Sequence, residues 1–60
     1  MKRSEKKVLT AVMKRPCTLA DLLYQLRLPA WKIKQAALAL VKAGDIELTG
    51  GKFYIRKGKP

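Results

Sequence analysis

The 60-residue sequence predicts an α+β fold in which three helices are followed by a two-stranded antiparallel β-hairpin. Three observations support this prediction. Apolar residues recur at helical spacing in three segments, a Pro or Gly follows each segment, and alternating apolar residues flank a Gly-Gly pair. A chain of this length buries only about 60% of the surface that it exposes when unfolded, so it has room for one small core. We therefore expect a single domain over residues 1–60.

The first helix is expected over about residues 4–15. Ser4 can cap the free amide groups at its start, and Glu5 lies at the positive end of the helix dipole. Its apolar residues share one stripe: Val8, Leu9, Val12 and Met13. Its cations are left to solvent: Lys6, Lys7, Lys14 and Arg15. Pro16 restricts the residue before it and so ends the helix.

The second helix is expected over about residues 18–27. Thr18 and Asp21 have the spacing of a capping box, in which the two residues satisfy each other's backbone amides. Four leucines then share one helical face: Leu19, Leu22, Leu23 and Leu26. The sequence Arg27-Leu28-Pro29 predicts the turn that follows.

The third helix is expected over about residues 30–43, with Gly44 as its left-handed cap. Its inward residues are Ile33, Ala37, Leu40 and Val41. At about 100° per residue, the residues opposite Ile33 are Trp31, Gln35, Leu38 and Lys42, with Lys32 and Lys34 on the flanks. The alanines at 36, 37 and 39 predict close packing against the second helix.

The hairpin is expected over about residues 45–56. A two-residue loop at Gly50-Gly51 pairs Leu48 with Phe53 and Ile46 with Ile55, so that these four apolar side chains share one face. The same register places Asp45 opposite Arg56. Residues 57–60 form a basic tail that we expect to fray.

The composition is strongly basic, with 14 Lys and Arg against 4 Asp and Glu and a formal net charge of +10. Solubility of a small domain asks for a net charge of only about 2–8 in magnitude, so this excess predicts contact with a polyanion such as a nucleic acid. A hydrophobic fraction of 48% argues against a disordered tail, and 30% charged residues against a membrane span.

Catalysis and metal binding lack the necessary side chains. The chain has no histidine, its single Cys17 cannot form an intramolecular disulfide, and its four carboxylates are scattered. We therefore expect no enzyme activity, no cofactor and no metal, and Cys17 is predicted to be a small buried filler. The apolar stretch at 8–13 is too short for a secretory signal, so we expect a cytoplasmic protein.

The order of these segments resembles the winged helix-turn-helix family. The residues that carry the resemblance are Leu19-x-x-Leu22-Leu23-x-x-Leu26, then Leu28-Pro29, then Ile33-x-x-Ala36-Ala37-x-x-Leu40-x-x-x-Gly44-x-Ile46, and then the hairpin. Members of that family insert the third helix into the DNA major groove and place the hairpin, or wing, on the backbone or the minor groove. The resemblance therefore implies double-stranded DNA binding by a small regulator of transcription or replication.

The resemblance also implies which residues meet the DNA. On the third helix they are Ala30, Trp31, Lys32, Lys34, Gln35 and Leu38. The wing tip is Gly50, Gly51 and Lys52. Three further residues complete the predicted DNA-binding set: Arg27, Arg56 and Thr18, the last because the helix N-terminus that it begins offers amides to a phosphate.

Two other functions remain open. Winged helices also bind proteins, and Trp31 with Leu38 could form an exposed patch for a partner or for self-association. Trp31 could instead pack back on Tyr24 and Leu28 to complete the core. An RNA-binding protein would share every charge feature noted above.

Overall fold

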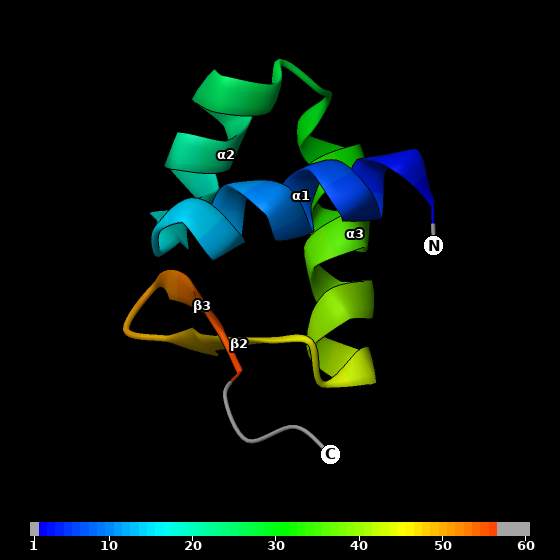
Figure 1. Ribbon diagram of the computed structural model, residues 1–60. Helices are drawn as coiled ribbons and strands as arrows, with labels where there is room; N and C mark the ends of the chain where they lie inside the picture. Colours follow the sequence, from blue (N-terminus) through cyan, green and yellow to red (C-terminus); the bar gives the residue numbers. More distant parts are fainter. Residues whose placement is uncertain (1, 57–60) are drawn as a thin grey trace.

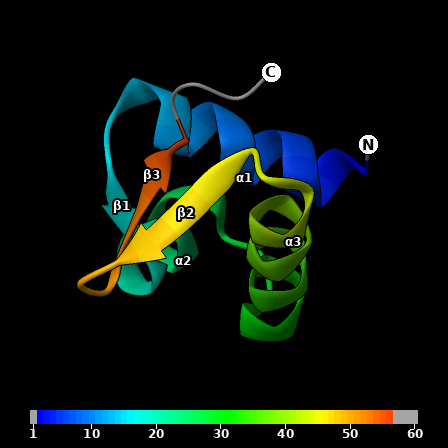
Figure 2. The same cartoon turned by 90° about the horizontal axis from the view of Figure 1, so that it is seen from below.

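The structure is a computed structural model that describes residues 2–56; the tail predicted at 57–60 lies outside this range. Its elements are α1 (Arg3–Lys14), β1 (Cys17–Thr18), α2 (Leu19–Leu26), α3 (Ala30–Ala43), β2 (Ile46–Thr49) and β3 (Lys52–Ile55) (Figure 1). Helix α1 crosses α3, and the sheet lies beside α3 under one end of α1 (Figures 1 and 2). The fold is thus α+β, with helices and sheet enclosing one core.

The sheet has three strands in the order β1-β3-β2, so the expectation of a two-stranded hairpin was wrong. Cys17 pairs with Phe53 and Thr18 pairs with Lys52, both antiparallel. The physical reason lies at Pro16. Arg15 before it is extended, with φ −169° and ψ 156°, and the chain leaves α1 along the edge of β3 that the hairpin leaves unpaired.

The hairpin itself has the predicted register. Ile46 pairs with Ile55 and Leu48 with Phe53, and the amide of Arg56 donates to the carbonyl of Asp45 at 3.2 Å. Gly50 and Gly51 form its loop with φ of 57° and 80°. A two-residue loop with positive φ at both positions matches the twist of the strands, and residues with a Cβ rarely adopt it.

The predicted caps of α2 and α3 are present, whereas that of α1 is not. The Thr18 hydroxyl accepts from the Asp21 amide at 3.1 Å, and the Asp21 carboxylate accepts from the Thr18 amide at 3.0 Å. Gly44 ends α3 with φ 83°. Helix α1 begins at Arg3 with Lys2 as its N-cap and no side-chain cap, which places Ser4 inside the first turn and excludes it as the cap.

The core lies between the three helices and the inner face of the sheet. Its buried residues are Val8, Ala11, Val12, Cys17, Leu22, Ile33, Ala36, Ala37, Leu40, Ile46 and Phe53. Two expectations fail here. Met13 is 67% exposed because α1 turns Ala11 inward between Val8 and Val12. Leu48 is 54% exposed because it lies on the edge strand β2, whereas its partner Phe53 lies on the central strand β3 and is buried.

Replacing Leu22 by Ala should lower the free energy of unfolding by about 2–5 kcal/mol, because its fully buried side chain would leave a cavity. Leu38, which is 63% exposed, provides a control of the same residue type. Leu38→Ala should change stability by less than about 0.5 kcal/mol. Urea unfolding followed by circular dichroism measures both, and equal losses would contradict this assignment of the core.

The capping box should make stability depend on pH. The hydrogen bonds from the Thr18 backbone and side chain hold the pKa of Asp21 below its usual value. A carboxylate with a lowered pKa in the folded state stabilises the fold above its unfolded pKa of about 4, and this stabilisation is lost as the pH falls further. The stability difference between the wild type and Asp21→Asn should therefore shrink from pH 6 to the acid range in urea titrations. A difference that stays constant with pH would refute this role.

Candidate nucleic-acid interface

Helix α3 divides into a buried side and a solvent side. The buried side contains Ile33, Ala36, Ala37 and Leu40, and the alanines bring the helix close to its neighbours. All six residues predicted to face DNA on this helix are exposed: Ala30, Trp31, Lys32, Lys34, Gln35 and Leu38. The helix contains no acidic residue, so its solvent side is electrostatically positive.

Trp31 belongs to this solvent side rather than to the core. Its side chain is 58% exposed and that of Tyr24 is 85% exposed, so the two aromatics do not complete the core together. The Lys32 Nζ lies 5.8 Å from the centre of the Trp31 ring. Such a cation–π contact is worth about 0.5–1 kcal/mol at an exposed site. An exposed aromatic ring and a positive charge therefore lie next to each other on the solvent side of α3.

A groove of about 250 Å³ separates α3 from the hairpin. Its lining is Leu19, Lys34, Ala37, Leu38, Val41, Leu48 and Phe53. Lys34 is the one charged residue among these described lining residues, and Leu38 and Leu48 leave more than half of their side chains exposed at it. Sequence reasoning missed this groove because it placed Leu48 in the core. The solvent side of α3 therefore continues into an apolar groove and then into the hairpin.

Of the remaining predicted residues, the structure brings Lys52 and Thr18 together and leaves Arg27 and Arg56 apart. Lys52 follows the Gly50-Gly51 loop and pairs with Thr18 across the sheet. The hydroxyl of Thr18 is already bonded to the amide of Asp21, so its role in the fold is that of a cap.

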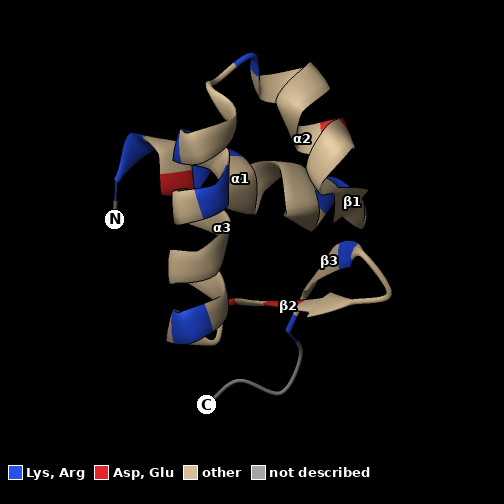
Figure 3. Ribbon diagram, turned by 180° about the vertical axis from the view of Figure 1, so that it is seen from behind, with Lys and Arg blue, Asp and Glu red and all other residues tan. Residues whose placement is uncertain are grey.

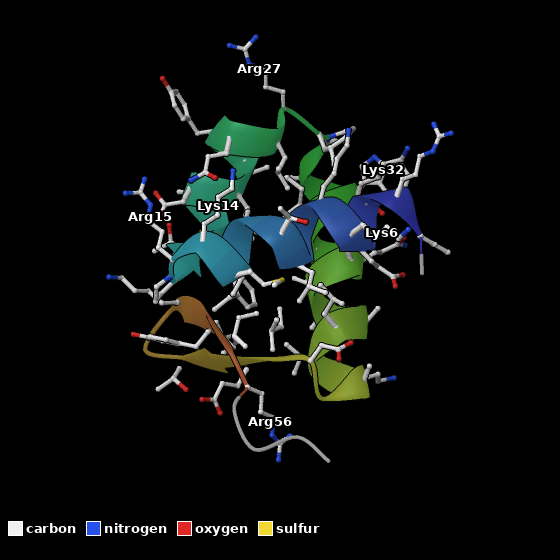
Figure 4. The ribbon with its side chains drawn as sticks, in the orientation of Figure 1. Lys6, Lys14, Arg15, Arg27, Lys32 and Arg56 are labelled. Atoms are coloured by element: carbon white, nitrogen blue, oxygen red, sulfur yellow. The ribbon has the colours of Figure 1, made fainter. Side chains whose placement is uncertain are left out.

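Arg27 and Arg56 lie at opposite ends of the molecule (Figure 4). Arg27 follows α2 in the left-handed conformation, with φ 53°. A Cβ built on Gly44 would lie 3.9 Å from Arg56 Nη1, which places this guanidinium at the C-terminal end of α3. A cation there is favoured by the negative end of the helix dipole. The two arginines therefore flank the α3 surface instead of joining its centre.

A second groove, of about 360 Å³, lies between α1 and α2. Its lining is Lys6, Lys7, Thr10, Ala11, Lys14, Gln25 and Leu26. From the sequence, these lysines were expected to face solvent, and no site was predicted at them. Their positions on α1, opposite Val8 and Val12, were a sequence signal that they share one face of the helix. The part of the groove that Gln25 of α2 lines has no such signal, because it depends on how the two helices pack.

Cys17 is buried, and its burial raises the pKa of the thiol, which donates to the carbonyl oxygen of Arg15 at 3.1 Å. No group of three or more potential metal-ligating side chains occurs within residues 2–56. None of the helices in this part of the chain has the length and apolar character needed to cross a membrane.

The exposure of Trp31 gives a direct test of this surface. Trp31 is the single tryptophan, and Lys32 should concentrate anions beside its ring. For each quencher, the quenching constant of the protein is divided by that of free tryptophan amide. This ratio should be larger for iodide than for neutral acrylamide. Lys32→Gln should reduce the iodide effect and leave the acrylamide effect unchanged. Weak quenching by both agents would place Trp31 in the core.

Comparison with solved structures identifies a close structural neighbour. The solution structure of a DNA binding protein from Sulfolobus islandicus superposes with a TM-score of 0.89 at 28% sequence identity. The match covers 95% of this chain and 98% of that one. No protein-family model matches the chain, and a search of curated proteins finds no match. The chain is thus similar in fold, over nearly its whole length, to a protein described as binding DNA.

Proposed function

We propose that this protein binds double-stranded DNA as a winged helix, with the solvent side of α3 in the major groove and the hairpin as the wing. The observation that carries the proposal is the acid-free solvent side of α3, with three lysines and a glutamine, on a chain of net charge +10. The similarity to the Sulfolobus islandicus DNA binding protein supports it, since the two chains correspond almost end to end.

The dimensions and side chains of α3 suit the major groove. A helix with its side chains is about 10–12 Å wide, and the groove of B-form DNA is about 12 Å wide. Lys32 and Lys34 project from the two flanks of the helix, where they can reach phosphates on either side or the acceptor atoms of guanine. Gln35 can pair with adenine, and Leu38 can contact a thymine methyl group.

In DNA binding, the hairpin serves mainly to orient α3, because it adds no net charge. Its described charged residues balance: Asp45, Glu47, Lys52 and Arg56. Lys52, next to the loop, is placed to contact a phosphate, while β1 and the core hold the hairpin beside α3. In this proposal the wing fixes the orientation of α3, and the protein acts as a small cytoplasmic regulator of transcription or replication.

The apolar groove supports a second candidate, which is a protein-interaction module. Leu38 and Leu48 line it and are each more than half exposed, and Trp31, which is also more than half exposed, lies about two turns before Leu38 on α3. An interface built on these side chains would depend on apolar burial, so its affinity would survive high salt. DNA binding has the opposite salt response.

Affinity for a short DNA duplex should fall steeply with salt. Neutralising about 4–6 phosphates gives a slope of log K against log salt of about −4 to −5. Lys34→Gln should weaken binding about three- to tenfold and make the slope shallower by about 1, because one phosphate contact is lost. Fluorescence anisotropy of a labelled duplex measures both quantities.

Lys2→Gln is the matched control, because it removes the same charge from an exposed residue outside the α3 surface. It should change the affinity less than about twofold. A flat salt response would refute nucleic-acid binding. Equal effects of the two variants would refute the assignment to α3.

A further inference from the structure

The positive charge of the chain is concentrated away from the proposed DNA surface. Helix α3 carries three cations, Lys32, Lys34 and Lys42, and the hairpin is balanced. Helix α1 and its flanking residues carry six: Lys2, Arg3, Lys6, Lys7, Lys14 and Arg15. Glu5 is the one carboxylate in this segment. Contact through α3 and the hairpin alone would leave this positive segment unused.

The cations of α1 form a row along one side of the helix. At about 100° per residue, Arg3, Lys7, Thr10 and Lys14 align within one narrow stripe, and Lys6 borders it. This stripe is opposite the buried Val8 and Val12, whereas Glu5 lies toward the core side. From Arg3 to Lys14 the row spans about 16 Å of helix axis. A rigid row of this length faces several successive phosphates of a duplex.

The row borders the α1/α2 groove, which adds neutral donors to the charge. The hydroxyl of Thr10 and the side-chain amide of Gln25 join Lys6, Lys7 and Lys14 in its lining. No carboxylate lines it among the described residues, and none of these three lysines forms an ion pair within residues 2–56. Lysine, threonine and glutamine side chains are typical donors to phosphate and sugar oxygens.

We propose that the α1/α2 groove binds the phosphate backbone of a second DNA duplex, so that one protein molecule bridges two duplexes. This inference rests on the proposed function for the first duplex. A phosphate backbone is the occupant that fits, because the site offers a straight line of positive charge with hydrogen-bond donors. Contacts from such side chains to phosphate and sugar oxygens carry no information about the base sequence. Binding there should therefore be independent of sequence.

The two surfaces can be occupied at the same time. The α1/α2 groove shares no lining residue with the α3/hairpin groove. Helix α1 crosses the front of α3 in Figure 1, and in the view from behind α3 lies in front of α1 (Figure 3). Lys6 and Lys14 project on the α1 side in Figure 4. A protein of net charge +10 placed between two duplexes would also reduce the repulsion between them.

Two variants with equal charge loss test the proposal: Lys7→Gln/Lys14→Gln on α1 and Lys32→Gln/Lys34→Gln on α3. Bridging is measured as capture of a fluorescent duplex by a bead-bound duplex in the presence of protein. Affinity for one short duplex is measured by anisotropy with protein in excess. All four lysines are exposed, so circular dichroism should show native folding in both variants.

The α1 variant should capture at least about tenfold less fluorescent duplex, while its affinity for a single duplex stays within about threefold of wild type. The α3 variant should lose about tenfold in single-duplex affinity. Capture by the α1 variant at the wild-type level would overturn bridging through this groove. The same result is expected if two associated protein molecules, each holding one duplex through α3, did the bridging.

Other outcomes separate the two proposals. If wild-type protein binds one duplex but captures no second one, bridging is wrong and the proposed function stands. If the α1 variant loses more single-duplex affinity than the α3 variant, the groove is the primary DNA site, and the assignment to α3 fails together with the two-surface arrangement. If duplex RNA but not DNA is captured through the groove, the second ligand is RNA and the proposal is overturned.

Discussion

The burial of one side of α3 is the constraint on which the rest of the structure depends. Ile33, Ala36, Ala37 and Leu40 contact the core formed by α1, α2 and the sheet. A 60-residue chain has little core to spare, so the small alanines matter because they let the neighbouring elements approach closely. Once this side is buried, helical geometry alone determines that Trp31 and Gln35 face outward.

The segment Cys17–Thr18 then fixes the hairpin relative to the helices. Its two residues pair with β3, and Thr18 also caps α2, so a single short stretch joins the sheet to the start of a helix. Cys17 contributes from the inside, where its buried side chain joins the core. The position of Lys52, next to the hairpin loop and opposite Thr18, therefore depends on this join as much as on the loop. An isolated two-stranded hairpin would be marginally stable in water.

Local sequence determined most of what could be predicted. The capping box at Thr18, the cap at Gly44 and the register around Gly50-Gly51 each depend on residues close together in the chain, and all are present. The failures involve contacts between distant segments. The pairing of β1 with β3 requires the chain after Pro16 to meet the hairpin, and the exposure of Met13 and Leu48 depends on where the core ends. In the candidate site, helical periodicity was enough to predict that the α3 residues lie on the surface. The two grooves could not be predicted in this way, because each is formed where two or more elements meet.

Charge opposes folding in this chain, and that opposition bears on its proposed ligands. The lysines of the α1/α2 groove lie within one or two turns of each other without an ion pair among the described residues. In the same row Arg3 and Lys7 lie four residues apart, and like charges at that spacing destabilise a helix by about 0.2–0.5 kcal/mol. An anion that binds the folded state and not the unfolded chain reverses that cost, because binding adds to folding stability by mass action. In the proposed complex the phosphates of DNA would neutralise this repulsion on α1 as well as contact α3. Binding and folding would then be linked through the same cations of α1. The unfavourable electrostatic free energy of placing them close together on one helix would decrease when DNA is bound.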